Sequence, residues 1–171
     1  MYADCKHARR LGLTAILATT CLLVSVEQPL ATTTTTTFAV SVTLAATCTI
    51  NSASALNFGN QGILSTNVDQ TSTIQVTCTN TTPYNIGLDA GTGTGATVAV
   101  RKLTSGGATV NYTLYSDSGR TTVWGNTIST DTVAATGNGA AQNYTVYGRI
   151  PTQATPAPGT YSDTITVTVT Y

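Results

Sequence analysis

The side chains that could carry out catalysis are scarce in this 171-residue chain. The only histidine is His7, in the extreme N-terminal segment, so the rest of the chain has no base for a Ser–His–Asp or Cys–His arrangement. Two of five later aspartates could form a glycosidase-like acid/base pair. However, each stands in a turn or strand position where a structural role accounts for the aspartate. These five are Asp69, Asp89, Asp117, Asp131 and Asp163. We therefore expect no catalytic residues and no enzyme.

Cysteine and glycine offer little more chemistry. Of four cysteines, only Cys48 and Cys78 follow the N-terminal segment. Without histidine partners, two cysteines cannot build a structural zinc site, so a metal is the weaker interpretation. An even number in an exported chain favours one disulfide, and closing a loop of about 30 residues would stabilise by roughly 3–4 kcal/mol. No glycine-rich stretch carries a phosphate-binding lysine. We expect no metal, no cofactor-binding residue and no small-molecule cofactor.

Charge excludes another class of function. Seven Lys and Arg balance seven Asp and Glu, and only 8% of the residues are charged, against about a quarter in typical proteins. Such a chain does not bind nucleic acid electrostatically. Threonine, with 39 copies, takes the place of charge. A composition rich in Thr and Val and poor in Lys and Glu favours strands over helices.

The N-terminus has the pattern of an export signal. A basic patch at residues 6–10 precedes an apolar run over residues 11–26. Sixteen residues, interrupted by Thr and Ser, are too few for a membrane span, which needs about 20. We predict a signal peptide over residues 1–31, cleaved after Ala31, with cleavage after Ala39 as the alternative.

The elements that would position any site are β-strands. A threonine run over residues 32–37 is typical of a flexible leader. Strict alternation of apolar and small or polar residues then extends over thirteen residues, and it recurs in segments 74–78, 86–88, 112–114, 144–146 and 161–171. The apolar positions of the first run are Phe38, Val40, Val42, Leu44, Ala46, Cys48 and Ile50. Turn residues separate the runs, so the pattern predicts an all-β, immunoglobulin-like antiparallel β-sandwich.

Two features are unusual for a complete sandwich. Thirteen extended residues would span roughly 43 Å, whereas strands rarely exceed 10 residues. We therefore split the run, with 46–50 as the first strand and 38–44 free to pair elsewhere, although 38–44 could also be an ordinary first strand of its own domain. The pattern of the last strand continues to the final residue, and on one face it carries Ile165, Val167, Val169 and Tyr171.

Nine stretches, in order, resemble the spore coat protein U domain family, whose best-understood members are subunits of archaic chaperone–usher pili such as the Csu pilus. The resemblance covers nearly all of residues 46–171. The stretches are Ala46-Thr47-Cys48, Leu56-Asn57-Phe58-Gly59, Ile74-Gln75-Val76-Thr77-Cys78, Pro83 to Gly91, Arg101-Lys102-Leu103 with Asn111 to Asp117 and Thr122 to Gly125, Val146 to Pro151, and Gly159 to Tyr171.

The resemblance implies a sandwich that lacks its last strand and has an N-terminal donor strand. It also implies a disulfide between Cys48 and Cys78. On this basis, residues 32–45 are the leader and donor strand, residues 46–171 the pilin domain, and Ile165 to Tyr171 the C-terminal strand beside the groove. The implied partners are a periplasmic pilus chaperone, an outer-membrane usher, and copies of the chain or sister pilins.

The expected function is a structural subunit of a surface pilus, exported through the periplasm to the cell surface and supporting adhesion and biofilm formation. The alternative is a secreted spore or cell coat protein, or an adhesin-type binding module, with the same sandwich. Trp124 and the eight tyrosines could stack on sugars in such a module, although core packing explains most of them better. A tip adhesin usually adds a receptor-binding domain, for which about 140 residues after the signal leave no space.

Overall fold

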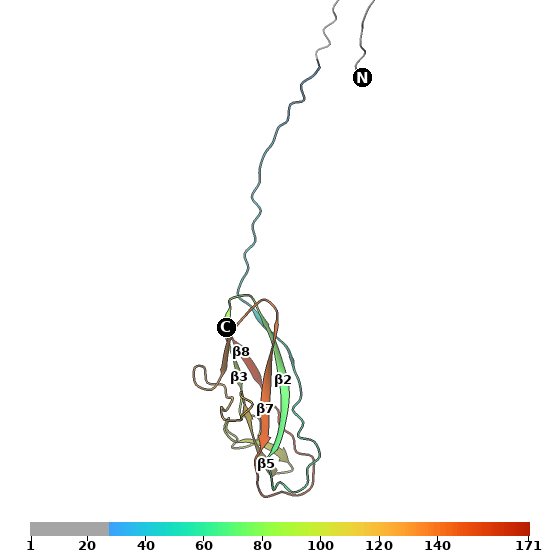
Figure 1. Cartoon of the computed structure of the whole chain (residues 1–171), viewed down its shortest axis with the longest axis vertical. Helices are drawn as coiled ribbons and strands as arrows, with labels where there is room; N and C mark the ends of the chain where they lie inside the picture. Colours follow the sequence, from blue (N-terminus) through green and yellow to red (C-terminus); the bar gives the residue numbers. More distant parts are fainter. Residues whose placement is uncertain (1–27) are drawn as a thin grey trace, which may run out of the picture. The chain divides into compact units, whose positions relative to one another are not determined.

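Eight β-strands make up the architecture of the computed structural model, which describes residues 28–171 (Figure 1). Between these residues the chain forms no helix, as its composition predicts. The predicted signal peptide falls, up to residue 27, outside the described residues. The strands are β1 (Cys48–Ala53), β2 (Val68–Cys78), β3 (Pro83–Leu88), β4 (Arg101–Ser105), β5 (Ala108–Tyr115), β6 (Val133–Thr136), β7 (Ala141–Ile150) and β8 (Val167–Thr170).

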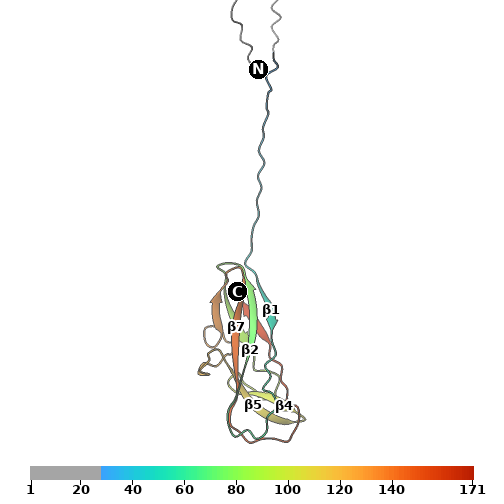
Figure 2. The same ribbon diagram turned by 45° about the vertical axis from the view of Figure 1, so that its right-hand side comes forward.

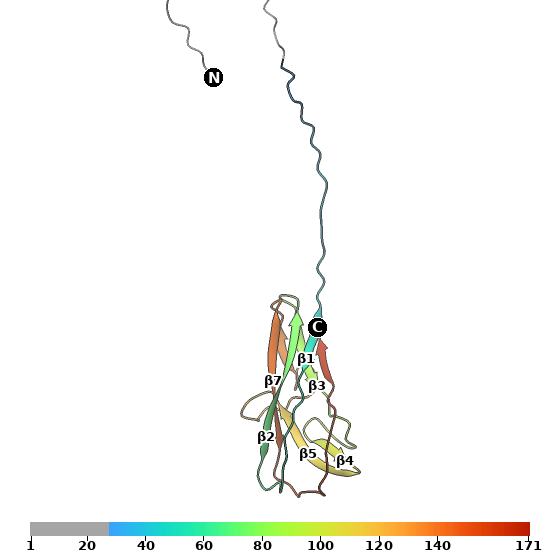
Figure 3. The ribbon, with the colours of Figure 1, turned by 90° about the vertical axis from the view of Figure 1, so that its right-hand side faces the viewer.

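The strands form two antiparallel sheets. One has five strands in the order β1-β2-β7-β5-β4, and the other has three in the order β6-β3-β8 (Figures 1 and 3). The longest pairing joins β2 to β7, from Val68 opposite Ile150 to Thr77 opposite Ala141. Side chains from both sheets meet in one core. The predicted antiparallel sandwich is therefore confirmed.

Period-two patterning explains which side chains enter the core. In β2, Ile74, Val76 and Cys78 are buried, whereas Gln75 and Thr77 between them lie on the opposite face and are partly exposed. Successive side chains of a strand point to opposite faces, so the alternation in the sequence becomes the two faces of the sheet. The turn of the β4–β5 hairpin is likewise determined by its own residues. Gly106 and Gly107 have φ angles of 52° and 93°, as a type I′ turn requires.

A buried arginine ties the loops to the core. Arg101, at the start of β4, has no exposed surface. Its guanidinium donates hydrogen bonds to four backbone carbonyls, those of Leu88, Asp89, Val98 and Trp124, at 2.7–3.1 Å. The Trp124 ring is also buried and donates from Nε1 to the Ile86 carbonyl at 2.8 Å. These contacts fix the end of β3 against the loop before β4.

The outermost strands differ in extent from the sequence pattern. The first strand covers Cys48–Ala53, whereas residues 46–50 were predicted. Alternation predicts a last strand over 161–171, but β8 covers only Val167–Thr170. Upstream of β8, the chain is held by an isolated bridge between Ser162 and Thr104 and by two aspartates. The apolar pattern continues there without a full backbone ladder.

Candidate functional site

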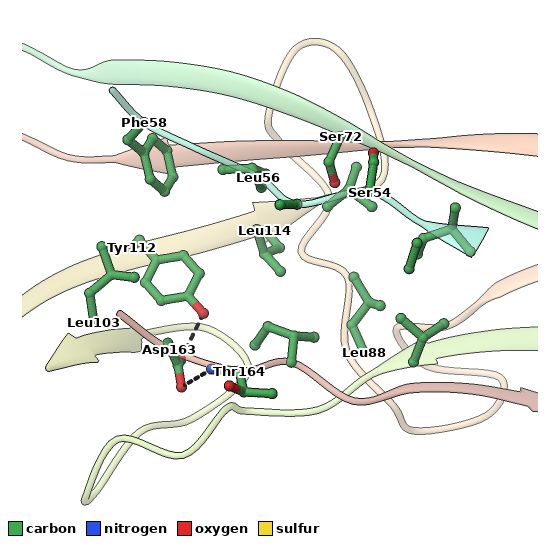
Figure 4. Close-up of a pocket in the computed structure, with 16 residues that line it drawn as sticks. Ser54, Leu56, Phe58, Ser72, Leu88, Leu103, Tyr112, Leu114, Asp163 and Thr164 are labelled. Atoms are coloured by element: carbon green, nitrogen blue, oxygen red, sulfur yellow. Dashed lines mark hydrogen bonds between the residues drawn. The ribbon is translucent and has the colours of Figure 1, made fainter. Parts of the chain in front are cut away.

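An apolar groove opens where the two sheets do not meet. β1 is an edge strand of the five-stranded sheet (Figure 2), and β8 is an edge strand of the three-stranded sheet. Between them lies a cavity of about 330 Å³, lined by residues 53–56, by Phe58 and by 163–165 with Val167 (Figure 4). We call this cavity, together with the open edge of β1 that continues into it at Ala53, the edge groove, and the segments 48–58 and 163–167 its two walls.

The floor of the edge groove is hydrophobic. It consists of side chains from five strands, namely Ile74, Leu88, Leu103, Leu114 and Val146. Leu56 and Phe58 project over it from one wall (Figure 4). Ile165 and Val167 line it from the other. Hydrophobic surface of this kind is stabilised when an apolar occupant removes it from water.

Unpaired backbone groups border the groove on the β8 side. The Asp89 N–H donates to the Thr166 carbonyl at 3.2 Å, which continues the β3–β8 ladder by one residue. Because backbone groups of alternate residues point to the same side of a strand, Thr166, Thr168 and Thr170 face β3. The N–H and C=O groups of Ile165, Val167 and Val169 therefore face the open side.

The β1 wall carries a second row of unpaired backbone groups. Ser54 N–H donates to the Thr73 carbonyl, and Thr79 N–H donates to the Thr47 carbonyl, both at 2.9 Å. These bonds place the backbone groups of Thr47 and Ser54 toward β2. A bulge between Ile50 and Ser52 shifts the alternation along β1, and the groups of Cys48, Ile50 and Ala53 then face the groove. Each of the two edge strands thus carries a row of free donors and acceptors, with which an added strand can pair.

One end of the groove is polar. The Asp163 carboxylate accepts hydrogen bonds from the Tyr112 hydroxyl and from the backbone N–H of Thr164, both at 2.8 Å (Figure 4). It also accepts one from the backbone N–H of Thr92 at 2.7 Å. Burial raises the pKa of the Tyr112 hydroxyl, and the bond to Asp163 raises it further, so the phenol stays a donor. This wall is thus fixed by side-chain bonds.

A second carboxylate supports the same wall. Asp89 accepts bonds from the N–H groups of Thr166 and Gly91, both at 3.0 Å. Burial of Asp89 opposes its ionised form, but the bonds from Thr166 and Gly91 outweigh burial, so its pKa is lowered. The wall therefore keeps an ionised anchor beside β8 at neutral pH.

A disulfide fixes the other wall. Cys48 and Cys78 lie directly opposite each other in β1 and β2, with their Cα atoms 4.1 Å apart, and their sulfurs are bonded. The predicted disulfide is therefore present in the structure. It ties the edge strand to the long central strand at the point where the leader enters β1.

The leader presents exposed apolar side chains. Residues 28–47 form no helix or strand. The side chains predicted for the donor strand are almost fully exposed, at 86% for Phe38, 84% for Val40, 81% for Val42 and 86% for Leu44. Four large apolar side chains in water within seven residues mark an interaction segment. Their assignment as a donor strand remains a prediction.

The residues predicted for the C-terminal groove strand lie in two environments. Ile165, Val167 and Val169 are half-buried and pack against the core, and the first two line the edge groove. Tyr171 is 60% exposed. The sequence alone assigns no role to the wall residues Leu56 and Phe58. Both lie in one of the motif stretches, which was the available signal.

The aspartates and arginines serve the fold. Arg149 forms a two-pronged ion pair with Asp69, at 2.7 and 2.8 Å. The reason is register, because Asp69 lies directly opposite Arg149 in the β2–β7 pair. Arg120 joins the same carboxylate at 3.3 Å and lies over the Tyr147 ring. Trp124 is buried and cannot stack on a sugar at the surface.

The remaining candidates for chemistry are few. Within residues 28–171, no group of three or more His, Cys, Asp or Glu side chains could hold a metal ion. The same part of the chain has no helix of sufficient length and hydrophobicity to cross a membrane. The edge groove and the exposed leader are thus the features on which a function can be argued.

Comparisons with known proteins show what the sequence and the fold are similar to. Protein U of Myxococcus xanthus is 32% identical over 124 residues, which cover 71% of this chain and 65% of Protein U. A similar solved structure is the CsuC–CsuE chaperone–tip adhesion subunit pre-assembly complex from archaic chaperone–usher Csu pili of Acinetobacter baumannii. The match has a TM-score of 0.57 and 24% identity, over 75% of this chain and 41% of that one.

The structural match supports an immunoglobulin-like sandwich of the kind found in pilins. The model of the Spore Coat Protein U domain matches residues 34–168, which include the leader segment 38–44 and both walls of the edge groove. This chain belongs to the spore coat protein U domain family.

Proposed function

We propose that this protein is a secreted structural subunit of a surface pilus, assembled by chaperone–usher donor-strand complementation. The observation that carries the proposal is the edge groove, with an apolar floor and a row of unpaired backbone groups on each wall. A sandwich with such an opening is one strand short, and an extended segment that adds a strand there satisfies both the apolar floor and the backbone.

Residues 38–44 are the proposed donor strand. Their apolar side chains alternate with Ala, Ser and Thr, so one face of the strand can enter the groove while the other stays in water. Burial of Phe38, Val40, Val42 and Leu44 would contribute about 6–12 kcal/mol as an upper estimate. Since domains are stable by about 5–15 kcal/mol, the donor strand would decide how well the subunit is folded.

The arrangement defines the proposed partners and location. A leader that fills the groove of another copy makes a head-to-tail contact that does not close on itself, and so a fibre. Before assembly, the open groove needs a periplasmic chaperone to cover it, and an outer-membrane usher to order the exchange. Residues 1–31 would direct export, 32–45 form the leader and donor strand, and 46–171 form the pilin domain. Adhesion and biofilm formation would follow from the fibres, with no catalysis and no cofactor.

A coat protein with the same sandwich is the second candidate. It is favoured by the similarity to Protein U and by the family to which the chain belongs. Such a protein could use the same groove within a surface layer that contains no fibres.

Deletion of residues 32–45 tests the proposal. We expect a disulfide-bonded subunit that binds its chaperone but cannot extend a fibre, as seen by negative-stain microscopy of surface material. Deletion of the threonine run 32–37 alone is the matched control, and this variant should still form fibres. Unimpaired fibres from the longer deletion would reject the donor strand, and a surface layer without fibres from the intact protein would favour the coat protein.

A further inference from the structure

We propose that the residues joining the leader to β1 prevent residues 38–44 from completing the groove of their own chain, and so reserve that groove for the leader of a second copy. This inference rests on the proposed function. The closest donor is the chain's own leader, because only Ala45, Ala46 and Thr47 separate Leu44 from β1.

Proximity would favour the chain's own leader. A segment on a short linker has an effective concentration in the millimolar range, so at about 1 µM subunit it would outcompete another copy by roughly a thousandfold. Fibres therefore require a barrier to self-completion. To reach its own groove, the leader must fold back on β1 as a hairpin.

The backbone of Thr47 limits this hairpin. Its N–H donates to the Thr79 hydroxyl at 3.1 Å, and its carbonyl accepts from the Thr79 N–H at 2.9 Å. Both groups therefore point toward β2 and away from the groove. Cys48 is the first residue whose backbone groups face the groove, and its side chain points inward to the disulfide.

Register excludes the loops of even length. Residues directly opposite each other share a face of the sheet, so a donor residue opposite Cys48 points into the core. A two-residue loop sets Leu44 opposite Thr47, and a four-residue loop sets Thr43 opposite Cys48. With the two-residue loop all four apolar side chains turn to the outer face. With the four-residue loop Leu44 lies in the loop, and the other three turn to the outer face.

The loops of odd length conflict with the residues present. A three-residue loop sets Leu44 opposite Cys48, but its last position requires a left-handed backbone. That position is Thr47, a β-branched residue for which positive φ is unfavourable, and the change would break both bonds to Thr79. A five-residue loop sets Val42 opposite Cys48 and leaves Leu44 outside the groove. Neither Ala45 nor Ala46 is a residue that favours a hairpin turn.

The leader of a second copy meets none of these restrictions. It reaches the groove without a turn, so all four apolar side chains can face inward while Thr47 of each copy keeps its bonds to Thr79. The same three linker residues that block self-completion thus favour assembly between copies.

The test installs the missing turn in the full mature chain. Insertion of Asn-Gly between Ala45 and Ala46 makes a five-residue loop that keeps Leu44 opposite Cys48 and supplies residues suited to positive φ. We expect a monomer by size-exclusion chromatography, a higher unfolding midpoint, and a fibre yield lower by roughly tenfold or more. Insertion of Ala-Ala at the same place is the matched control and should polymerise like the parent.

Two further variants distinguish failure of this inference from failure of the proposed function. Thr47→Gly permits the three-residue loop, so it should raise the fraction of monomeric protein above that of Thr47→Ala. This pair provides the test if the Asn-Gly variant does not fold. Replacement of Phe38, Val40, Val42 and Leu44 by threonine should abolish both polymer and self-completed monomer. If this fourfold variant still forms fibres, the proposed function fails. If it does not, but the Asn-Gly and Thr47→Gly variants polymerise like the parent, only the present inference is overturned.

Discussion

At the scale of single residues, Arg101 has the most demanding environment. Its guanidinium is fully enclosed, and its partners are the carbonyls of Leu88, Asp89, Val98 and Trp124. Burial lowers the pKa of this side chain, while the nearby Tyr112, Asp89, Asp163 and Asp131 act in the opposite direction. A charge at this depth is tolerated because every bond it makes replaces a bond to water.

Replacement of Arg101 by methionine should therefore destabilise the domain. The four carbonyls would lose their donor inside the protein, and we expect the free energy of unfolding to fall by about 3 kcal/mol. Urea unfolding of the oxidised protein measures this difference. Lys102→Met is the matched control, because the Lys102 ammonium donates only to the exposed Thr94 carbonyl, and it should change stability by less than about 0.5 kcal/mol. Equal effects of the two variants would contradict the role given to Arg101.

The ion pair at Asp69 should make stability depend on pH. The bond from Arg149 lowers the pKa of the Asp69 carboxyl, burial opposes this, and the charge of Arg120 lowers it further. Because the folded pKa lies below the unfolded value, the pair stabilises the fold above about pH 4, and this contribution is lost as the pH falls through the folded pKa.

For Asp69→Asn we expect a loss of about 0.5–1 kcal/mol at pH 7, since the carboxylate is partly exposed and screened. The loss should shrink as the pH is lowered below about 4 and through the folded pKa, which urea titrations at a series of pH values would show. Arg149→Gln should behave in the same way. A difference from the parent that stays constant with pH would contradict the ion-pair explanation.

At the scale of elements, β1 is the strand that we expect to detach most easily from its sheet. It is a six-residue edge strand, it pairs only with β2, and it forms one wall of the edge groove. The Cys48–Cys78 bond closes a loop across 30 positions of sequence. An edge strand held by one neighbour opens more easily than a central one, and the cross-link opposes that opening.

Removal of the disulfide should therefore affect β1 first. The Cys48→Ser, Cys78→Ser double variant should lose about 3–4 kcal/mol of stability. By hydrogen exchange, the amides of β1 should lose their protection at lower denaturant than those in the centre of the β2–β7 pair. The reduced parent protein is the control and should match the variant. Uniform loss of protection across all strands would show that the bond stabilises the domain without a special role at the wall.

The sequence predicts the inner strands better than the edges. Alternation is a local property, so the inward positions of 74–78 and the glycine turn at 106–107 can be found without a structure. The short β8 cannot, because the wall before it depends on Asp89 and Asp163, whose partners are distant in the chain. The Arg149–Asp69 pair was missed for the same reason, since it depends on a strand register that neither residue encodes locally.

At the scale of the whole molecule, charge is nearly absent from the surface that would drive association. After residue 31 the chain carries four basic and five acidic side chains. Of these only Asp163 lines the edge groove, and it is bonded to Tyr112 and Thr92. Binding of a donor strand should then depend on apolar burial and backbone pairing, which salt does not screen.

We expect fibre assembly to be almost independent of sodium chloride. Between about 50 mM and about 1 M, the rate should change less than about threefold, because few exposed charges are available to screen. Ammonium sulfate should accelerate assembly, since it strengthens apolar burial. Light scattering of the subunit after release from its chaperone measures both. A tenfold loss of rate in sodium chloride would indicate that ionic contacts between subunits dominate.

The position of the disulfide also has a mechanical consequence. Tension applied through residue 47 enters the domain at Cys48 and passes directly to β2 by the covalent link to Cys78. The load then acts along the ten residue pairs that join β2 to β7, which must shear together, while the short ladder of β1 is spared from unzipping. We therefore expect a domain pulled by its leader to resist through the β2–β7 pairing, and reduction of the disulfide to shift the load to the shorter β1–β2 pairing.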